Sequence, residues 1–189
     1  MTAARMTDLE VPKIILDLCG GTGAWSKPYK DAGYDVRVIT LPEDDVRLWS
    51  FPHRVYGILA APPCTHLAGS GARWWKQKGT PALLQALSVV DACLRYVVTC
   101  KPHFWALENP VGRLFRYLGP PTLYFNPCDY GDPWTKKTLL WGDFNIPKPN
   151  PVEPTEGSKM HLVPPGPKRQ EIRSITPPGF ARAFFEANP

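Results

Sequence analysis

The strongest constraint on the fold is a short buried strand that runs straight into a glycine-rich turn and a helix. Residues 13–18 read Lys-Ile-Ile-Leu-Asp-Leu, a β-branched apolar run that predicts a buried strand. A Cys-Gly-Gly-Thr-Gly turn follows over 19–23, and a helix is predicted over 27–32, ended by Gly33. Glycines let the backbone pass close to a ligand, and a helix N-terminus offers unpaired N–H groups. This order is typical of the first unit of a nucleotide-binding α/β fold.

The remaining apolar runs predict the other elements of the fold. A run with apolar residues at helical spacing predicts a long helix over 81–100, and a final helix is expected over 180–187. Residues 46–51 predict a short helix or turn. Further strands are predicted over 35–41, 55–61, 104–107, 123–125 and 138–141.

Two segments are expected to lack regular structure. Residues 65–79 combine glycines with Trp74 and Trp75, which suggests a mobile loop able to close on a ligand. Residues 143–173 are rich in proline and have little periodicity, so we expect either an ordered irregular excursion or a flexible linker.

Length and composition narrow the class of protein. A chain of 189 residues favours one domain with a sizeable core. We expect no segment that spans a bilayer, and residues 1–10 do not resemble a signal peptide, so a cytoplasmic protein without a membrane partner is expected. Five scattered cysteines argue against a disulfide framework, and no set of four close ligands predicts a metal.

The basic residues suggest, without proving, a polyanionic partner. The formal net charge is +5, and seven lysines and arginines lie between Arg73 and Arg116. They predict either a solvated face or a surface that contacts phosphates, and the sequence leaves both interpretations open.

The most reactive candidate follows the strand predicted over 55–61. That strand ends at Pro62 and Pro63, whose fixed backbone angles hold the next residue, Cys64, on a stiff turn. Position alone leaves two interpretations, an inert buried cysteine or a reacting group. Glu108 ends a later strand, and in an open α/β sheet it would face the same crevice as Cys64.

A run of acidic residues follows the second strand directly. Glu43, Asp44 and Asp45 come after Pro42 with no room for a long helix. Acids at this place commonly bind ribose hydroxyls, and the alternative is a solvated acidic turn.

In this order, the motifs resemble the cytosine-C5 DNA methyltransferase family. The resemblance runs from Leu16 to about Gly142, with a weak continuation at 174–179. Its motifs are a cofactor loop at 17–23, an Asp-Val pair at 45–46, the Pro-Cys motif at 62–64, an acidic motif at 108–110, and a Tyr-Gly-Asp-Pro motif at 130–133 with Lys136.

The resemblance implies a fold and a domain plan. The fold would be a Rossmann-like α/β methyltransferase fold, a single domain with a mostly parallel sheet and helices on both faces. Residues 1–142 would form the catalytic core, and 174–189 a C-terminal segment and helix that complete it. The excursion 143–173 would replace the family's large target-recognition domain. Short members of this kind occur in bacteriophages, so we expect a phage source and low or short-context specificity, read by 65–79 and the excursion.

The resemblance also implies the chemistry and the partners. Cys64 would add to C6 of cytosine as the nucleophile, Glu108 would share a proton at N3, and Lys136 would contact the base or its phosphate. The partners would be S-adenosylmethionine and DNA, with no metal, and a monomer is favoured. The expected cofactor-binding residues are Asp17, Leu18, Cys19, Gly20, Gly21, Thr22, Gly23, Leu41, Glu43, Asp44, Asp45, Val46 and Pro62. The expected substrate-binding residues are Pro63, Thr65, His66, Ser70, Asn109, Pro110 and Arg113.

The chain departs from the family at several places. Cys19 stands where the family has a phenylalanine that stacks on adenine, so Trp25, Leu41 or Pro42 would cover the adenine instead. These departures keep two alternatives open. The chain could methylate a free cytidine nucleotide or single-stranded DNA, or it could be a catalytically silent module that binds DNA or cofactor.

Overall fold

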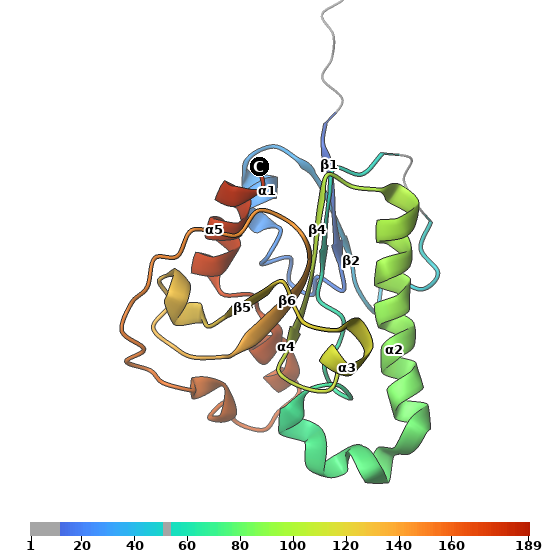
Figure 1. Ribbon diagram of the computed structural model, residues 1–189, viewed down its shortest axis with the longest axis vertical. Coiled ribbons are helices and arrows are strands. Elements are labelled where there is room, and N and C mark those ends of the chain that lie inside the picture. Colours follow the sequence, from blue (N-terminus) through green and yellow to red (C-terminus); the bar gives the residue numbers. More distant parts are fainter. Residues whose placement is uncertain (1–11, 51–53) are drawn as a thin grey trace, which may run out of the picture.

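The computed structural model describes residues 12–50 and 54–189, and it contains one six-stranded sheet (Figure 1). The strand order is β2-β1-β3-β4-β6-β5. Strands β2, β1, β3 and β4 are parallel, whereas β6 runs antiparallel to both of its neighbours. The bounds are β1 (Ile14–Leu18), β2 (Asp35–Ile39), β3 (Gly57–Ala60), β4 (Phe104–Pro110), β5 (Leu123–Phe125) and β6 (Thr138–Asp143). The predicted mostly parallel α/β sheet is confirmed.

Helices cover both faces of the sheet. The long helix α2 lies on one face, while α1 and α5 lie together on the other (Figure 1). The helices are α1 (Lys27–Asp31), α2 (Trp75–Cys100), α3 (Phe115–Leu118), α4 (Arg169–Ser174) and α5 (Pro178–Ala187). The described residues also form the short 3-10 helices η1 (Gly69–Trp74), η2 (Pro127–Tyr130) and η3 (Lys159–His161).

The strands bury side chains on both faces, as expected for a covered parallel sheet. On β1, Leu16 packs in the cluster beneath α2, whereas the adjacent Ile15 packs on the other face of the sheet with Tyr29 of α1. Helix α5 completes that second cluster with Phe180 and Phe184, both fully buried. The C-terminal helix is therefore part of the core.

The strand order changes direction at β1, and this places the candidate site. The chain leaves β1 outward to β2 and then returns to the other side of β1 as β3. In open α/β sheets, ligands bind outside the carboxyl ends of the strands at such a switch point. The glycine turn after Leu18 and the Pro62–Cys64 segment after β3 both lie at this edge.

Residues 69–79 of the segment predicted as a mobile loop are helical, so the loop prediction is wrong for them, whereas residues 65–67 form a turn. Residues 69–74 form η1, and α2 begins at Trp75 rather than Pro81. The helix is interrupted at Gly79, whose φ of 67° breaks the regular backbone. Pro81 is tolerated because it lies in the first turn after that break. The other predicted helices and strands are confirmed within one to three residues at their ends, except that residues 51–53 lie outside the described part.

The expectation that no segment could span a bilayer is also wrong, because one helix is long and apolar enough to do so. Within the described residues, the helical stretch Gly69–Cys100 contains a window of mean hydropathy 1.5, of which 28% is buried in the protein. One such helix is weak support for a membrane span, because a helix packed on a sheet can meet the same criterion. On α2, Val90, Cys93 and Tyr96 are buried against the sheet.

The proline-rich excursion is ordered against the rest of the fold. The amides of Asn150 and Val152 donate to the carbonyls of Asp129 and Cys128, at 2.9 and 2.8 Å. Of the two predicted forms, the structure therefore shows the ordered irregular excursion.

Candidate active site

The glycine turn after β1 is closed over a buried carboxylate. Asp17 is fully buried and accepts a 2.5 Å hydrogen bond from the Ser26 hydroxyl. A Cβ at Gly20 would lie 2.4 Å from the Asp17 carboxyl carbon, so only glycine fits there. Gly21 and Gly23 have φ of 55° and 71°, a region that favours glycine. The sequence of this turn is thus dictated by its close approach to Asp17.

The buried carboxylate retains one unused oxygen. Burial raises the pKa of Asp17 to about 6, although the hydrogen bonds from Ser26 oppose the shift. Among the described residues, none donates a hydrogen bond to Asp17 Oδ1. An orphaned carboxylate oxygen beneath a glycine turn fits a ligand that carries an ammonium group, such as S-adenosylmethionine.

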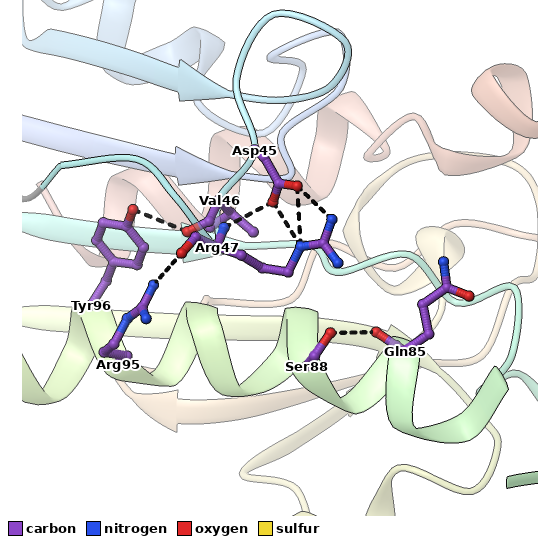
Figure 2. A network of polar contacts seen from close by, with 7 residues as sticks. All are labelled: Asp45, Val46, Arg47, Gln85, Ser88, Arg95 and Tyr96. Atoms are coloured by element: carbon purple, nitrogen blue, oxygen red, sulfur yellow. Dashed lines mark hydrogen bonds and ion pairs between the residues drawn. The ribbon is translucent and has the colours of Figure 1, made fainter. Parts of the chain in front are cut away.

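The turn after β2 is held by internal contacts (Figure 2). Arg47 Nε donates to Asp45 Oδ1 at 2.9 Å, and this pairing lowers the pKa of Asp45 to about 2. Val46 is buried in the core, and the Tyr96 hydroxyl donates to its carbonyl at 3.1 Å. Arg95 on the same helix donates to the Arg47 carbonyl at 2.8 Å. Asp45 and Val46 therefore form contacts inside the protein that hold this turn in place.

The other residues expected to bind cofactor lie on either side of that turn. Leu41 and Glu43 are exposed, and Asp44 is half-buried. Leu18 is fully buried in the core, whereas Thr22 is exposed on the glycine turn. Of the residues predicted to bind cofactor, those of the glycine turn lie at the switch point, whereas the Leu18 side chain is buried in the core.

Cys64 begins a helical turn at the end of β3. Its backbone carbonyl accepts hydrogen bonds from the amides of Leu67 and Ala68, at 2.9 and 2.8 Å. The residue is exposed, as are its neighbours Pro63 and Thr65. Cys64 is therefore not one more fully buried cysteine.

Three charged groups act on the Cys64 thiol. Desolvation by the surrounding protein atoms raises its pKa most, even though the residue as a whole is exposed, and the Glu108 carboxylate adds to the rise. Lys136 and, more weakly, Arg173 lower the pKa of the thiol. These groups come from β4, from the approach to β6 and from the end of α4, so four separate segments meet here.

Glu108 lies on β4 just beyond the residues paired with β3. Leu107 pairs with Ala60, which places Glu108 at the edge where Cys64 emerges. Burial raises the pKa of Glu108, and Lys136 opposes that rise. Within the part of the chain that the structure describes, no group hydrogen-bonds to this carboxyl group. The carboxyl group of Glu108 is therefore left for a ligand.

A small cavity opens beside Glu108. Lys136 reaches it because β6 runs antiparallel, so the residues before Thr138 lie at the carboxyl end of β4. The lining residues are Trp25, Glu108, Phe125, Lys136, Thr138, Ser174, Thr176, Pro177 and Phe180.

Trp25 lines this cavity, in the wall shared with Glu108. It is only 2% exposed and packs against Phe180 and Phe184, with ring centroids 6.1 and 5.5 Å apart. Its indole N–H has no partner among the described residues. The sequence analysis suggested that Trp25 could cover the adenine of the cofactor. In the structure, Trp25 lines the cavity beside Glu108.

Asn109 holds the cysteine turn in place. It is fully buried, and its side-chain amide donates to the Pro62 carbonyl at 2.9 Å. The next residue, Pro110, pairs with Thr138 at the end of β4. The sequence predicted substrate contacts for both, whereas the structure uses Asn109 to join the ends of two strands.

Arg113 supports the same turn from its other side. Its Nε donates to the His66 carbonyl at 2.8 Å, and its guanidinium lies 4.7 Å from the Trp75 ring centroid. A Cβ at Gly112 would lie 2.0 Å from the Leu67 carbonyl oxygen, so this close approach requires glycine. Arg113 is thus a positioning residue for the Cys64 turn.

His66 and Ser70, both predicted to bind substrate, follow Cys64 in this turn and in η1. His66 Nδ1 is 3.4 Å from Lys78 Nζ. Desolvation, followed by Lys78 and Arg113, lowers the pKa of His66, which favours a neutral ring at pH 7. Ser70 is exposed on η1.

The Tyr-Gly-Asp-Pro segment supports α5. Tyr130 packs edge-on against Phe180 at 5.2 Å, and Asp132 Oδ2 accepts from the Gly179 amide at 2.9 Å. Lys136 Nζ donates to the Arg173 carbonyl at 3.0 Å. Sequence reasoning assigned no role to Arg173, because 37 residues separate it from Lys136 and no periodicity links them.

A search of the described ranges, 12–50 and 54–189, finds no group of three or more His, Cys, Asp or Glu side chains that could hold a metal ion.

Comparisons with known proteins identify the fold. No family model and no curated protein matches the sequence. A crystal structure assigned as a DNA modification methyltransferase, encoded within an E. coli prophage, matches with a TM-score of 0.54 and 18% identity, over 75% of this chain and 53% of that one. The Entamoeba histolytica methyltransferase EhMeth matches with a TM-score of 0.47 and 12% identity, over 83% and 61%. The chain thus spans just over half the length of these proteins, and it has the Rossmann-like methyltransferase fold.

Proposed function

We propose that this protein is a DNA cytosine-5 methyltransferase with low or short-context sequence specificity. The observation that carries the proposal is the meeting of Cys64, Glu108 and Lys136 at one edge of the sheet, next to the glycine turn. A methyltransferase fold with a prophage-encoded DNA modification methyltransferase among its structural neighbours supports this choice of reaction class.

Each reacting group has a defined task. The Cys64 thiolate adds to C6 of cytosine, forming an S–C6 bond and leaving C5 electron-rich. Glu108 shares its proton with N3 and so disperses the negative charge that develops on the ring. S-adenosylmethionine, when bound beside the glycine turn, supplies the methyl group that C5 receives. Removal of the C5 proton by a base then expels the Cys64 thiolate, returns the shared proton from N3 to Glu108 and restores the aromatic ring.

The surroundings tune both groups for this task. The raised pKa of Glu108 keeps a proton available at higher pH than for an ordinary carboxyl. Desolvation and Glu108 raise the pKa of Cys64, and Lys136 opposes that rise and so favours the thiolate. A base in a duplex reaches such a site only after it leaves the stack, at a cost of a few kcal/mol.

The direct test is mass spectrometry of nucleosides after incubation with S-adenosylmethionine. We expect 5-methylcytosine in duplex DNA with the wild-type protein and none with Cys64→Ala. Methylation of dCMP or single-stranded DNA alone would favour the nucleotide or single-strand alternative. Cofactor or DNA binding without any methylated product would instead identify a silent binding module.

A further inference from the structure

The stretch in which the proline-rich excursion ends and the C-terminal segment begins returns to the reacting groups. Ser174, Thr176 and Pro177 line the same cavity as Glu108 and Lys136. The 3.0 Å hydrogen bond from Lys136 Nζ to the Arg173 carbonyl anchors this stretch at the site. We call residues 173–177 the return segment.

Arg173 brings a cation that the chain itself leaves unneutralised. None of the acidic residues in the described ranges forms an ion pair with it. It is half-buried at the end of α4 and close enough to Cys64 to favour the thiolate electrostatically. A positive side chain held at a reacting edge without a carboxylate partner is suited to an anionic substrate group.

The other arginine near this turn serves a different purpose. Arg113 donates through Nε to the His66 carbonyl and stacks on Trp75, and its Nη2 is buried inside the protein, away from a ligand. Arg173 uses its backbone carbonyl, not its guanidinium, to bind Lys136. Of these two arginines, Arg173 is therefore the one whose guanidinium is left for a ligand.

We propose that the Arg173 guanidinium binds a backbone phosphate next to the target cytosine, and that the return segment thereby positions DNA in place of a separate recognition domain. The inference rests on the proposed function, because it takes DNA as the substrate. A guanidinium matches phosphate oxygens with two parallel hydrogen bonds, which a single ammonium cannot do. Phosphate contacts position DNA without reading its sequence.

The test is the salt dependence of binding to a fluorescent DNA duplex, measured by anisotropy. Each phosphate contact contributes about 0.9 to the slope of log K against log salt concentration. We expect Arg173→Gln to reduce the slope by about that amount. Arg173→Lys should keep the slope but bind more weakly at every salt concentration, because the paired hydrogen bonds are lost. Arg37→Gln is the matched control, since Arg37 pairs with Asp35 on the edge strand β2.

The result that overturns the proposal is a wild-type slope and affinity for Arg173→Gln, or an equal loss in Arg37→Gln. Absence of measurable duplex binding by the wild-type protein at low salt would overturn it as well. Failure of the proposed function is recognised separately, by the absence of methylated cytosine with the wild-type protein. Methylation by the wild type together with an unchanged slope in Arg173→Gln would reject the phosphate contact alone.

Discussion

The two sides of the carboxyl edge of the sheet differ in how their polar groups are paired. On the side of β1 and β2, the carboxylates are engaged by the chain itself, Asp17 by Ser26 and Asp45 by Arg47. On the side of β3 and β4, Cys64 is exposed, and Glu108 has no hydrogen-bond partner in the described residues. The first side pairs its carboxylates within the chain and leaves only Asp17 Oδ1 without a donor among the described residues, whereas the second leaves Cys64 exposed and Glu108 without a hydrogen-bond partner.

This difference has a physical meaning. A desolvated polar group without a partner costs free energy, so a chain gains nothing in stability from leaving one at a cleft. Groups with perturbed pKa values in a cleft are candidates for chemistry for that reason. The difference predicts that changes to the exposed Cys64 and the unpaired Glu108 affect the reaction most, whereas changes to polar groups that pair within the chain affect stability.

The largest effect is expected for Glu108→Gln. The amide keeps the shape of the side chain but cannot give a proton to N3, so single-turnover methyl transfer should fall about 10²- to 10⁴-fold. Glu186→Gln, on the exposed side of α5, is the matched control and should retain activity. An unchanged rate in Glu108→Gln would remove the proposed role of this carboxyl.

The next effect concerns stability on the other side, through Asp17→Asn. Because burial raises the folded-state pKa of Asp17 to about 6, the native state holds more protons than the unfolded chain between pH 4 and 6. Wild-type stability should therefore fall as pH rises through this window, by up to about 3 kcal/mol relative to Asp17→Asn. Denaturant unfolding at pH 4 and pH 7 measures the difference, and a constant gap between the two proteins would contradict it.

A smaller effect is expected at the residue that joins β4 to the cysteine turn. Asn109→Ala leaves the buried Pro62 carbonyl without its donor and should cost about 1–3 kcal/mol of unfolding free energy. Activity should fall together with stability, because the Cys64 turn loses one of its supports. A variant with wild-type stability would show that this hydrogen bond is not needed.

The smallest effect is a shift in the titration of Cys64, followed by alkylation and peptide mass spectrometry over a pH series. Lys136 lowers the pKa of the thiol, whereas Glu108 raises it. Lys136→Gln should therefore move the midpoint to higher pH and Glu108→Gln to lower pH. Lys137→Gln, a change of its exposed neighbour, should leave the midpoint in place. Shifts of the same sign would show that these charges do not act on Cys64.

Much of the fold could be predicted because local sequence patterns determine most of its helices and strands. The buried strands are short apolar runs ended by glycine or proline, and the positions of Cys64 and Glu108 followed from the ends of two such runs. The start of α2 was missed because Gly79 and Pro81 look like breakers in a sequence. In the structure they form only a local interruption between Trp75 and Cys100.

The rest of the site depends on contacts between distant segments. Nothing local distinguishes an asparagine that binds substrate from Asn109, which is buried against the Pro62 carbonyl. The same holds for Arg113. It can donate to the His66 carbonyl only when the loop that follows β4 packs against the Cys64 turn. The approach of Ser174–Pro177 to Glu108 depends on how the excursion folds back, which no sequence period records.

The most direct test of the reacting side is a covalent trap with duplex DNA that contains 5-fluorocytosine, in the presence of S-adenosylmethionine. Fluorine at C5 cannot leave as a proton does, so the S–C6 bond should persist. We predict an adduct with the wild-type protein that survives denaturing electrophoresis and maps to Cys64, with none in Cys64→Ala. No adduct with the intact protein, or an undiminished adduct in Cys64→Ala, would contradict the account.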